Sequence, residues 1–291
     1  MRHSRTTRNG SILILSLVWG QLAIAQFSGP EGYKEIGRTT ERELNVVLSC
    51  SFGTIVISKG EPEKILVVES ARRRNSKMHV SYAIRDRVGY LELGMGKGHD
   101  EHKTGSVHVS DFSGGKWYLR FSDAIPVSFD IELGVGKGDF DLSGLQVKDF
   151  TLSTGASEVN LSFEEKNKCT IDNINIEAGV CKFTGRNLGN ADFKRFQFAG
   201  GVGTSLLDFS GKLEREVDVD IEVGLGILTI VIPQEVGARL FYEESWISKL
   251  DYANDFQPTA DNEYISDNYN RASGKMNIRI DSGIGSVRVR R

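Results

Sequence analysis

The sequence predicts an all-β protein, a single-domain β-solenoid of the parallel β-helix type with about 22 residues per coil and atypical capping ends. Between residues 127 and 233, a strand-like block, a glycine-centred corner and a second strand-like block recur five times. The corner glycines are spaced 21, 24, 22 and 23 residues apart; they are Gly134, Gly155, Gly179, Gly201 and Gly224. A near-constant period with a strand in every copy is typical of stacked coils.

Each block alternates apolar and polar residues, as a half-buried strand does. Val127, Phe129, Ile131 and Leu133 are apolar, and the residues between them are polar, so the apolar side chains point to one face. One copy cannot cover its own apolar row, whereas a second copy stacked on it can. Because each coil must turn sharply, we expect the corner glycines to adopt positive φ. The alternative is an antiparallel sandwich with glycine-rich hairpins, which rarely reuses one corner motif in one register.

The first 25 residues have the pattern of an export signal. Three arginines precede an apolar stretch over residues 11–22, and Ala23-Ile24-Ala25 follows as a small-residue cleavage site. The apolar stretch is too short to span a membrane comfortably. We therefore expect cleavage after Ala25 and a periplasmic or extracellular protein that is not membrane-spanning once the signal is removed.

The remaining chain divides into four parts. Residues 26–126 are predicted to form N-terminal capping strands and the first degenerate coils, and residues 127–237 the regular coils. Residues 238–274 interrupt the period with an insertion rich in aromatic and acidic residues, and residues 275–291 form the final coil. Atypical ends are expected, because a repeat array must cover the open core at each end.

The charge distribution argues against nucleic-acid binding. After removal of residues 1–25, 33 basic and 39 acidic residues remain, a formal charge of −6. Two short basic runs stand out, Arg72-Arg73-Arg74 and the tail with Arg288, Arg290 and Arg291. We expect both runs on solvated strand edges, where charge opposes edge-to-edge pairing; the alternative is contact with a polyanion.

Three cysteines are present: Cys50, Cys169 and Cys181. Cys181 lies within a strand register, so we expect it to act as a small buried residue. A Cys169–Cys181 bridge remains open, because an oxidising compartment would permit it.

The sequence indicates no catalytic, cofactor-binding or metal-binding residues. The loops at residues 94–98 and 134–138 resemble phosphate loops, but Gly follows the Lys and a strand follows the loop, so a solenoid corner is the better interpretation. No nucleophile elbow or cysteine–histidine pattern occurs. The polar cluster His99-Asp100-Glu101-His102, with His108 nearby, is expected to be solvated, with metal binding as the alternative.

One acidic residue precedes the corner glycine in several copies; these are Glu92, Glu132, Glu177, Glu222 and Asp281. Equal registers stack in a solenoid, so these side chains are expected to form a row about 4.8 Å apart per coil. A solvated face is the expected role, and a cation site or partner surface is the alternative.

The insertion supplies the candidate partner surface, because long segments that interrupt a repeat often carry function and aromatic residues anchor interfaces. Its members are Trp246, Tyr252, Phe256, Tyr264 and Tyr269. The other interpretation, which we favour, is that these aromatic residues close the open end of the solenoid.

Several blocks together carry a family resemblance; they are WYLRFSDAIP from Trp117, IELGVGKGDFDLSGL from Ile131, GASEVNLSF from Gly155, DFSGKL from Asp208 and GLGILTIVIP from Gly224. They resemble the toast-rack β-solenoid proteins of bacterial cell envelopes, related to the C-terminal domain of LiaF-type envelope-stress regulators and to adhesins of the same repeat type. The resemblance implies a non-enzymatic scaffold or adhesin-like module whose partner is an envelope protein or a glycan. An accessory role in envelope-stress signalling and a polysaccharide hydrolase or lyase are the alternatives.

Overall fold

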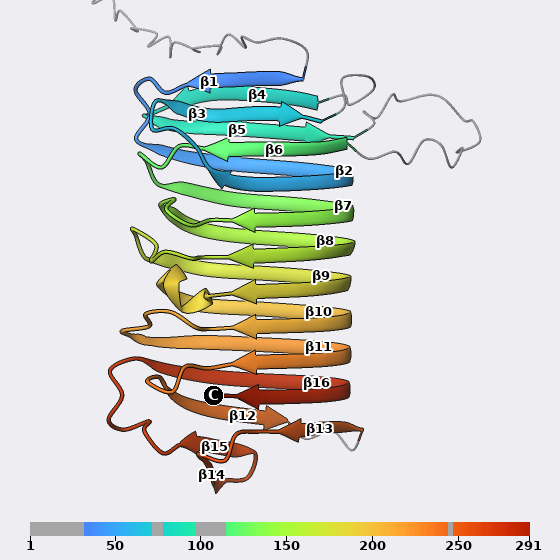
Figure 1. Ribbon diagram of the computed structural model, residues 1–291, viewed down its shortest axis with the longest axis vertical. Coiled ribbons are helices and arrows are strands. Elements are labelled where there is room, and N and C mark those ends of the chain that lie inside the picture. Colours follow the sequence, from blue (N-terminus) through green and yellow to red (C-terminus); the bar gives the residue numbers. More distant parts are fainter. Residues whose placement is uncertain (1–31, 72–77, 97–114, 244–246) are drawn as a thin grey trace, which may run out of the picture.

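The computed structural model describes residues 32–71, 78–96, 115–243 and 247–291. These residues form one 16-stranded sheet, and their helical content is the short 3₁₀ helix η2, Leu188–Ala191. Figure 1 shows long strands that bend back on themselves and stack into an elongated pile. The predicted all-β solenoid is confirmed. No helix in the described ranges is long and apolar enough to cross a membrane.

Seven long bent strands make up the body of the stack, and neighbouring strands run parallel. In spatial order they are β2 (Glu43–Lys59), β7 (Val127–Asp141), β8 (Val147–Ser162), β9 (Ile171–Arg186), β10 (Phe193–Asp208), β11 (Glu216–Val231) and β16 (Lys275–Arg290). Each strand supplies both arms of one coil, which is why strands of 15–17 residues occur here.

The register confirms the period read from the sequence. Ile131 pairs with Leu152, and Leu152 pairs with Ile176. Ile176 in turn pairs with Phe198, which pairs with Ile221. Ile131, Ile176 and Ile221 therefore lie in one buried row.

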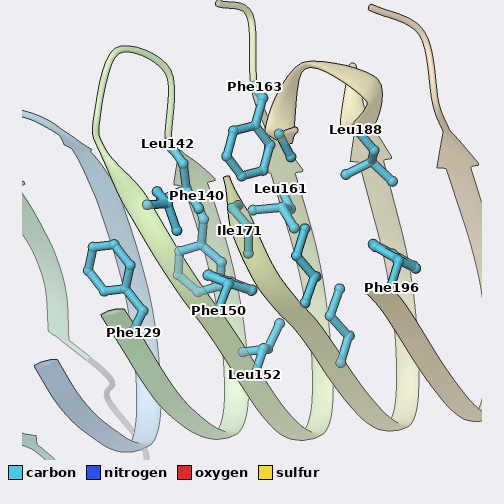
Figure 2. Close-up of a cluster of buried hydrophobic side chains, with 14 of the residues drawn as sticks. Phe129, Phe140, Leu142, Phe150, Leu152, Leu161, Phe163, Ile171, Leu188 and Phe196 are labelled. Carbon is cyan, nitrogen blue, oxygen red and sulfur yellow. The ribbon is translucent and has the colours of Figure 1, made fainter. Parts of the chain in front are cut away.

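The core lies between the two arms of each coil. In β7 the odd-numbered residues 127–133 are buried, but after the corner the even-numbered residues 138 and 140 are buried instead. This change of parity turns both arms toward the same interior, as Figure 2 shows for Phe129 and Phe140 around Phe150. The ring centroids of Phe129 and Phe140 lie 6.5 and 6.4 Å from that of Phe150. Burying each such side chain contributes about 1.5–3 kcal/mol.

The expectation that the named corner glycines adopt positive φ is wrong. Gly134, Gly155, Gly179, Gly201 and Gly224 are absent from the positive-φ glycines; they are required because stacked backbones approach closely. A Cβ on Gly155 would lie 2.5 Å from the carbonyl oxygen of Gly134. Positive φ belongs to a second row two residues further on, with values of 147–153°; it comprises Gly53, Gly136, Gly203, Gly226 and Gly285.

The N-terminal end is closed by a split coil and antiparallel strands. β5 (Val88–Met95) pairs with the first arm of β2, and β6 (Gly115–Phe121) pairs with the second arm. Three more strands then pair antiparallel, β4 on β5, β3 on β6 and β1 on β3; they are β4 (Met78–Arg85), β3 (Lys64–Ser70) and β1 (Tyr33–Gly37). The stack thus ends in antiparallel strands instead of an open parallel edge.

The C-terminal end is closed in the same way by the insertion. β16 lies between β11 and β12, so the last coil in the sequence is not the last in space (Figure 1). β12 (Gly237–Glu243) and β13 (Ser248–Asp251) pair with the two arms of β16. β15 (Glu263–Ser266) and β14 (Phe256–Ala260) continue the sheet antiparallel. The strand at this edge, β14, has only 5 residues, and short edge strands limit edge-to-edge association.

The expectation of a strand edge is wrong for Arg288, which pairs with Thr229 of β11 on one side and with Asp251 of β13 on the other. Arg290 extends beyond the end of β13, and its Nη2 donates to Asp251 Oδ2 at 2.8 Å. Arg291, with 6 % of its side chain exposed, forms an ion pair of 2.9 Å with Asp255. These arginines fasten the insertion to the stack. Arg72–Arg74 lie outside the described residues.

The three cysteines are free thiols. Cys181 is buried, as expected, and its Sγ lies 3.2 Å from Ser157 Oγ. Burial raises the pKa of Cys50 to about 11, and it also raises the pKa of Cys169 and of Cys181.

These pKa shifts predict thiol reactivity. Because the thiolate is the reactive form, we expect a thiol reagent at pH 8 to label Cys50 and Cys181 very slowly in the folded protein. Half-buried Cys169 should react first, and denaturation without reductant should release three reactive thiols. A loss of two thiols under denaturing conditions would instead demonstrate a Cys169–Cys181 bridge.

Candidate functional site

Most of the aromatic residues predicted as a partner surface face inward. Phe256 and Tyr269 are 3 % and 7 % exposed. Tyr252 and Tyr264 are half-buried, pack against the core, and have ring centroids 4.7 Å apart. Trp246 lies outside the described residues. This burial favours the interpretation of the insertion as a cap, and a partner role for these residues stays a prediction.

Tyr269 shows how the cap is fixed. Its hydroxyl donates to Asn277 Oδ1 at 2.9 Å, and its ring lies under the guanidinium of Arg239 at 4.8 Å. Burial is the main cause of the raised pKa of the Tyr269 phenol. A Cβ on Gly237 would approach the Tyr269 Cα to 2.7 Å, so the start of β12 is closely packed against the backbone of Tyr269.

Among the described aromatic residues of the insertion, Phe241 is the one that is exposed, and the candidate partner surface predicted from the sequence omitted it. Phe241 lies on the outer face of β12 and is 36 % exposed. The signal was present in the alternation of residues 238–243: Ala238, Leu240 and Tyr242 are buried, so the residues between them face outward. The alternation of inward and outward side chains along this strand therefore predicts that Phe241 faces outward.

Phe241 borders a recess of about 260 Å³ on the outer face of the first arms. We call this the Phe241 recess; it is lined by Arg195, Asp218, Asp220, Phe241, Asn277 and Arg279. Register explains why these residues meet. One row across β10, β11 and β16 contains Arg195, Asp218 and Asn277, and the row two residues further on, which points to the same face, contains Asp220, Arg279 and Phe241.

The polar groups of the recess are positioned but not fully paired. The Asn277 amide nitrogen donates to Glu216 Oε1 at 2.9 Å and to Asp218 Oδ1 at 3.4 Å, which fixes the orientation of the amide. Arg279 Nη1 lies 3.7 Å from Asp220 Oδ1, and both side chains remain accessible. Among the described residues, Arg195 has no ion pair or side-chain hydrogen bond partner. The recess therefore offers an aromatic face beside free acceptors and donors.

The acidic row is confirmed for four of its five predicted members. Glu132, Glu177, Glu222 and Asp281 share one register, with Ser153 and Ala199 at the same position on the coils between them. Glu92 is out of register and its prediction is wrong: it pairs with Val47, which lies opposite Asp130, two residues before Glu132.

The acidic row borders a groove of about 790 Å³ whose floor is formed by corner glycines. Within the ranges that the structure describes, no group of three or more histidine, cysteine, aspartate or glutamate residues is placed to hold a metal ion. The cluster from His99 to His108 lies outside those ranges.

Parallel bent coils, stacked glycine corners and split end coils define the chain as a toast-rack β-solenoid. The chain belongs to the toast-rack family: the family described as the N-terminal domain of toast_rack, DUF2154, matches residues 28–186. No curated protein matches the sequence.

Two solved structures are similar over most of their length. A candidate cell adhesion protein from Clostridium sporogenes is 20 % identical, with a TM-score of 0.45; the match covers 89 % of this chain and 97 % of that protein. A candidate adhesin from Bacteroides fragilis is 12 % identical, with a TM-score of 0.34 and coverage of 88 % and 95 %.

Proposed function

We propose that the protein is an exported component of the bacterial envelope that acts as a non-enzymatic, adhesin-like binding module with a glycan as its partner. The observation that carries this proposal is the Phe241 recess, where an exposed ring lies beside carboxylates, an oriented amide and a guanidinium. The rigid sheet beneath it holds these groups in fixed relative positions, which reduces the entropic cost of binding.

The chemistry of the recess suits a sugar ring. The apolar face of a pyranose packs against an aromatic ring, and its hydroxyl groups donate to carboxylates and accept from guanidinium groups. The recess volume of about 260 Å³ is close to the lower end of ordinary small-molecule sites, about 300 Å³, and therefore suits a single ring. Because the recess is open along the outer face of the arms, neighbouring sugars of a longer chain would lie on the sheet.

Replacing Phe241 with alanine tests the proposal. We expect glycan binding by the purified protein, measured on a panel of envelope and host-cell polysaccharides, to weaken at least tenfold, a loss of about 1.4 kcal/mol. Because Phe241 is partly exposed, stability should change only modestly, by about 0.5–1 kcal/mol.

Val47→Ala is the matched control, since Val47 is 50 % exposed on β2, four strands away from β10, the nearest strand of the recess. It should bind like the wild type. Absence of glycan binding by the wild-type protein, or equal binding by Phe241→Ala, would overturn the assignment of this recess.

A further inference from the structure

A second surface feature runs along the outer corner of the stack. Ten large hydrophobic side chains are exposed in the described residues, and five of them share one register. We call this row the corner ladder; its exposed members are Val135 (44 %), Val180 (60 %), Val202 (45 %), Leu225 (47 %) and Ile284 (47 %). Ala156 occupies the same position on β8 and is also exposed.

The ladder is straight and projects from its surroundings. At about 4.8 Å per strand, the six coils from β7 to β16 give it a length of about 24 Å. In most coils the apolar residue stands between two glycines, as Val202 does between Gly201 and Gly203, so no neighbouring side chain on its own strand covers it. A contiguous exposed apolar row of this kind marks an interaction site more often than a solvated surface.

On two of the six coils, β7 and β9, the flanks of the ladder carry opposite charges, whereas on β8 the flank that follows the ladder carries Glu158. On β7, Glu132 precedes the ladder and Lys137 follows it; on β9, Glu177 precedes it and Lys182 follows it. The side chains of Lys137 and Lys182 are 66 % and 67 % exposed, and both contact Glu158 on the coil between them, at 2.9 and 3.0 Å.

We propose that the corner ladder is an interface between two copies of this chain, related by a two-fold axis parallel to the stack. Such a rotation places each coil beside the same coil of the second copy. It also sets the flank that precedes the ladder in one copy against the flank that follows the ladder in the other. Lys137 then faces Glu132 of the second copy, and Lys182 faces Glu177 of the second copy. An antiparallel arrangement places Glu132 opposite Asp281, two like charges, so the charge pattern selects the parallel pair.

Other occupants fit this surface less well. The ladder is aliphatic and offers no aromatic ring for a sugar to stack on, and its acidic flank repels an anionic lipid surface. A second copy matches the ladder in length, straightness and charge. The apolar row alone has less surface area than the roughly 800 Å² that each partner buries in a standard interface. The dimer is therefore weak and concentration-dependent.

Single cysteines at the two ends of the ladder test the geometry. In the parallel dimer each ladder residue faces its own counterpart, so Val135→Cys and Ile284→Cys should each form a disulfide-linked dimer when the purified protein is treated with a mild oxidant. Val47→Cys, exposed but off the ladder, and the wild-type protein should stay unlinked. A disulfide that forms only when the two variants are mixed would demonstrate an antiparallel pair and overturn the proposal.

Sedimentation equilibrium tests the interface without cysteines. Val180→Asp combined with Leu225→Asp should weaken self-association at least tenfold. Lys182→Glu should also weaken self-association. The charge-swapped Glu177→Lys, Lys182→Glu protein should restore self-association, because each copy then presents the reversed pair of charges.

A wild-type protein that stays monomeric at its solubility limit, or an aspartate variant that associates like the wild type, would refute the dimer. Since the Phe241 recess lies on another face, neither result bears on glycan binding.

Discussion

Gly203→Ala is expected to destabilise the protein by at least about 4 kcal/mol or to prevent folding. Gly203 has φ of 149°, where side chains are rarely tolerated, and a Cβ there would lie 1.9 Å from the carbonyl oxygen of Cys181 on the next coil. That oxygen belongs to the backbone of a paired strand, so it cannot move without breaking the ladder of hydrogen bonds. Urea denaturation followed by circular dichroism would measure the loss.

Cys181→Ala is the matched control for this substitution. Cys181 occupies the same register position on the adjacent coil and pairs directly with Gly203. It carries a side chain, and its backbone φ is not positive. Removing its sulfur should cost only about 1 kcal/mol. Equal losses for the two variants would contradict the argument that backbone approach, and not burial, dictates glycine in this row.

Arg291→Ala is expected to lower the free energy of unfolding by about 2–4 kcal/mol. The guanidinium of Arg291 pairs with Asp255 at 2.9 Å and donates to the carbonyl oxygens of Val236 and Gln234 at 2.9 and 3.2 Å. It also lies 5.6 Å from the ring centre of Phe256, which is buried in the cap. Removing it leaves the Asp255 carboxylate and the Val236 carbonyl oxygen without this donor and weakens the attachment of the insertion to the tail.

The neighbouring Arg290→Ala is the control, because Arg290 and its partner Asp251 are 46 % and 49 % exposed. An exposed pair contributes at most about 1 kcal/mol. Hydrogen exchange would separate the two effects: Arg291→Ala should accelerate exchange over residues 237–274 while the coils β7–β10 stay protected. Uniform acceleration across the chain would show that the cap and the coils unfold as one unit.

The regular coils could be predicted from the sequence because one face of every strand is buried. A shift of one residue would expose Ile131, Ile176 and Ile221, so the alternation fixes their inward direction and the period fixes their stacking. A separate argument, that the open core at the end of the array must be covered, favoured the insertion as a cap. The alternation also places Phe241 on the outer face, once it is followed from Ala238.

Other features could not be read in this way. Glu92 lies in a block that looks like that around Glu132, yet it is displaced by two residues, and a shift of two keeps every side chain on the same face. The alternation of inward and outward side chains therefore cannot detect the displacement of Glu92. The repeat period also cannot predict that β16 lies between β11 and β12, because a period gives the spacing of the strands and not the position to which a later strand returns. The roles of Arg290 and Arg291 follow from that position of β16.

The way both ends terminate has a consequence for evolution. Because antiparallel strands close the two ends and the interior rungs contact only adjacent rungs, a duplication of one repeat in the middle would lengthen the rod by about 4.8 Å and leave both terminal structures intact. Relatives can therefore differ in length by whole coils. Any row of side chains that repeats along the stack would gain one more residue with each added coil.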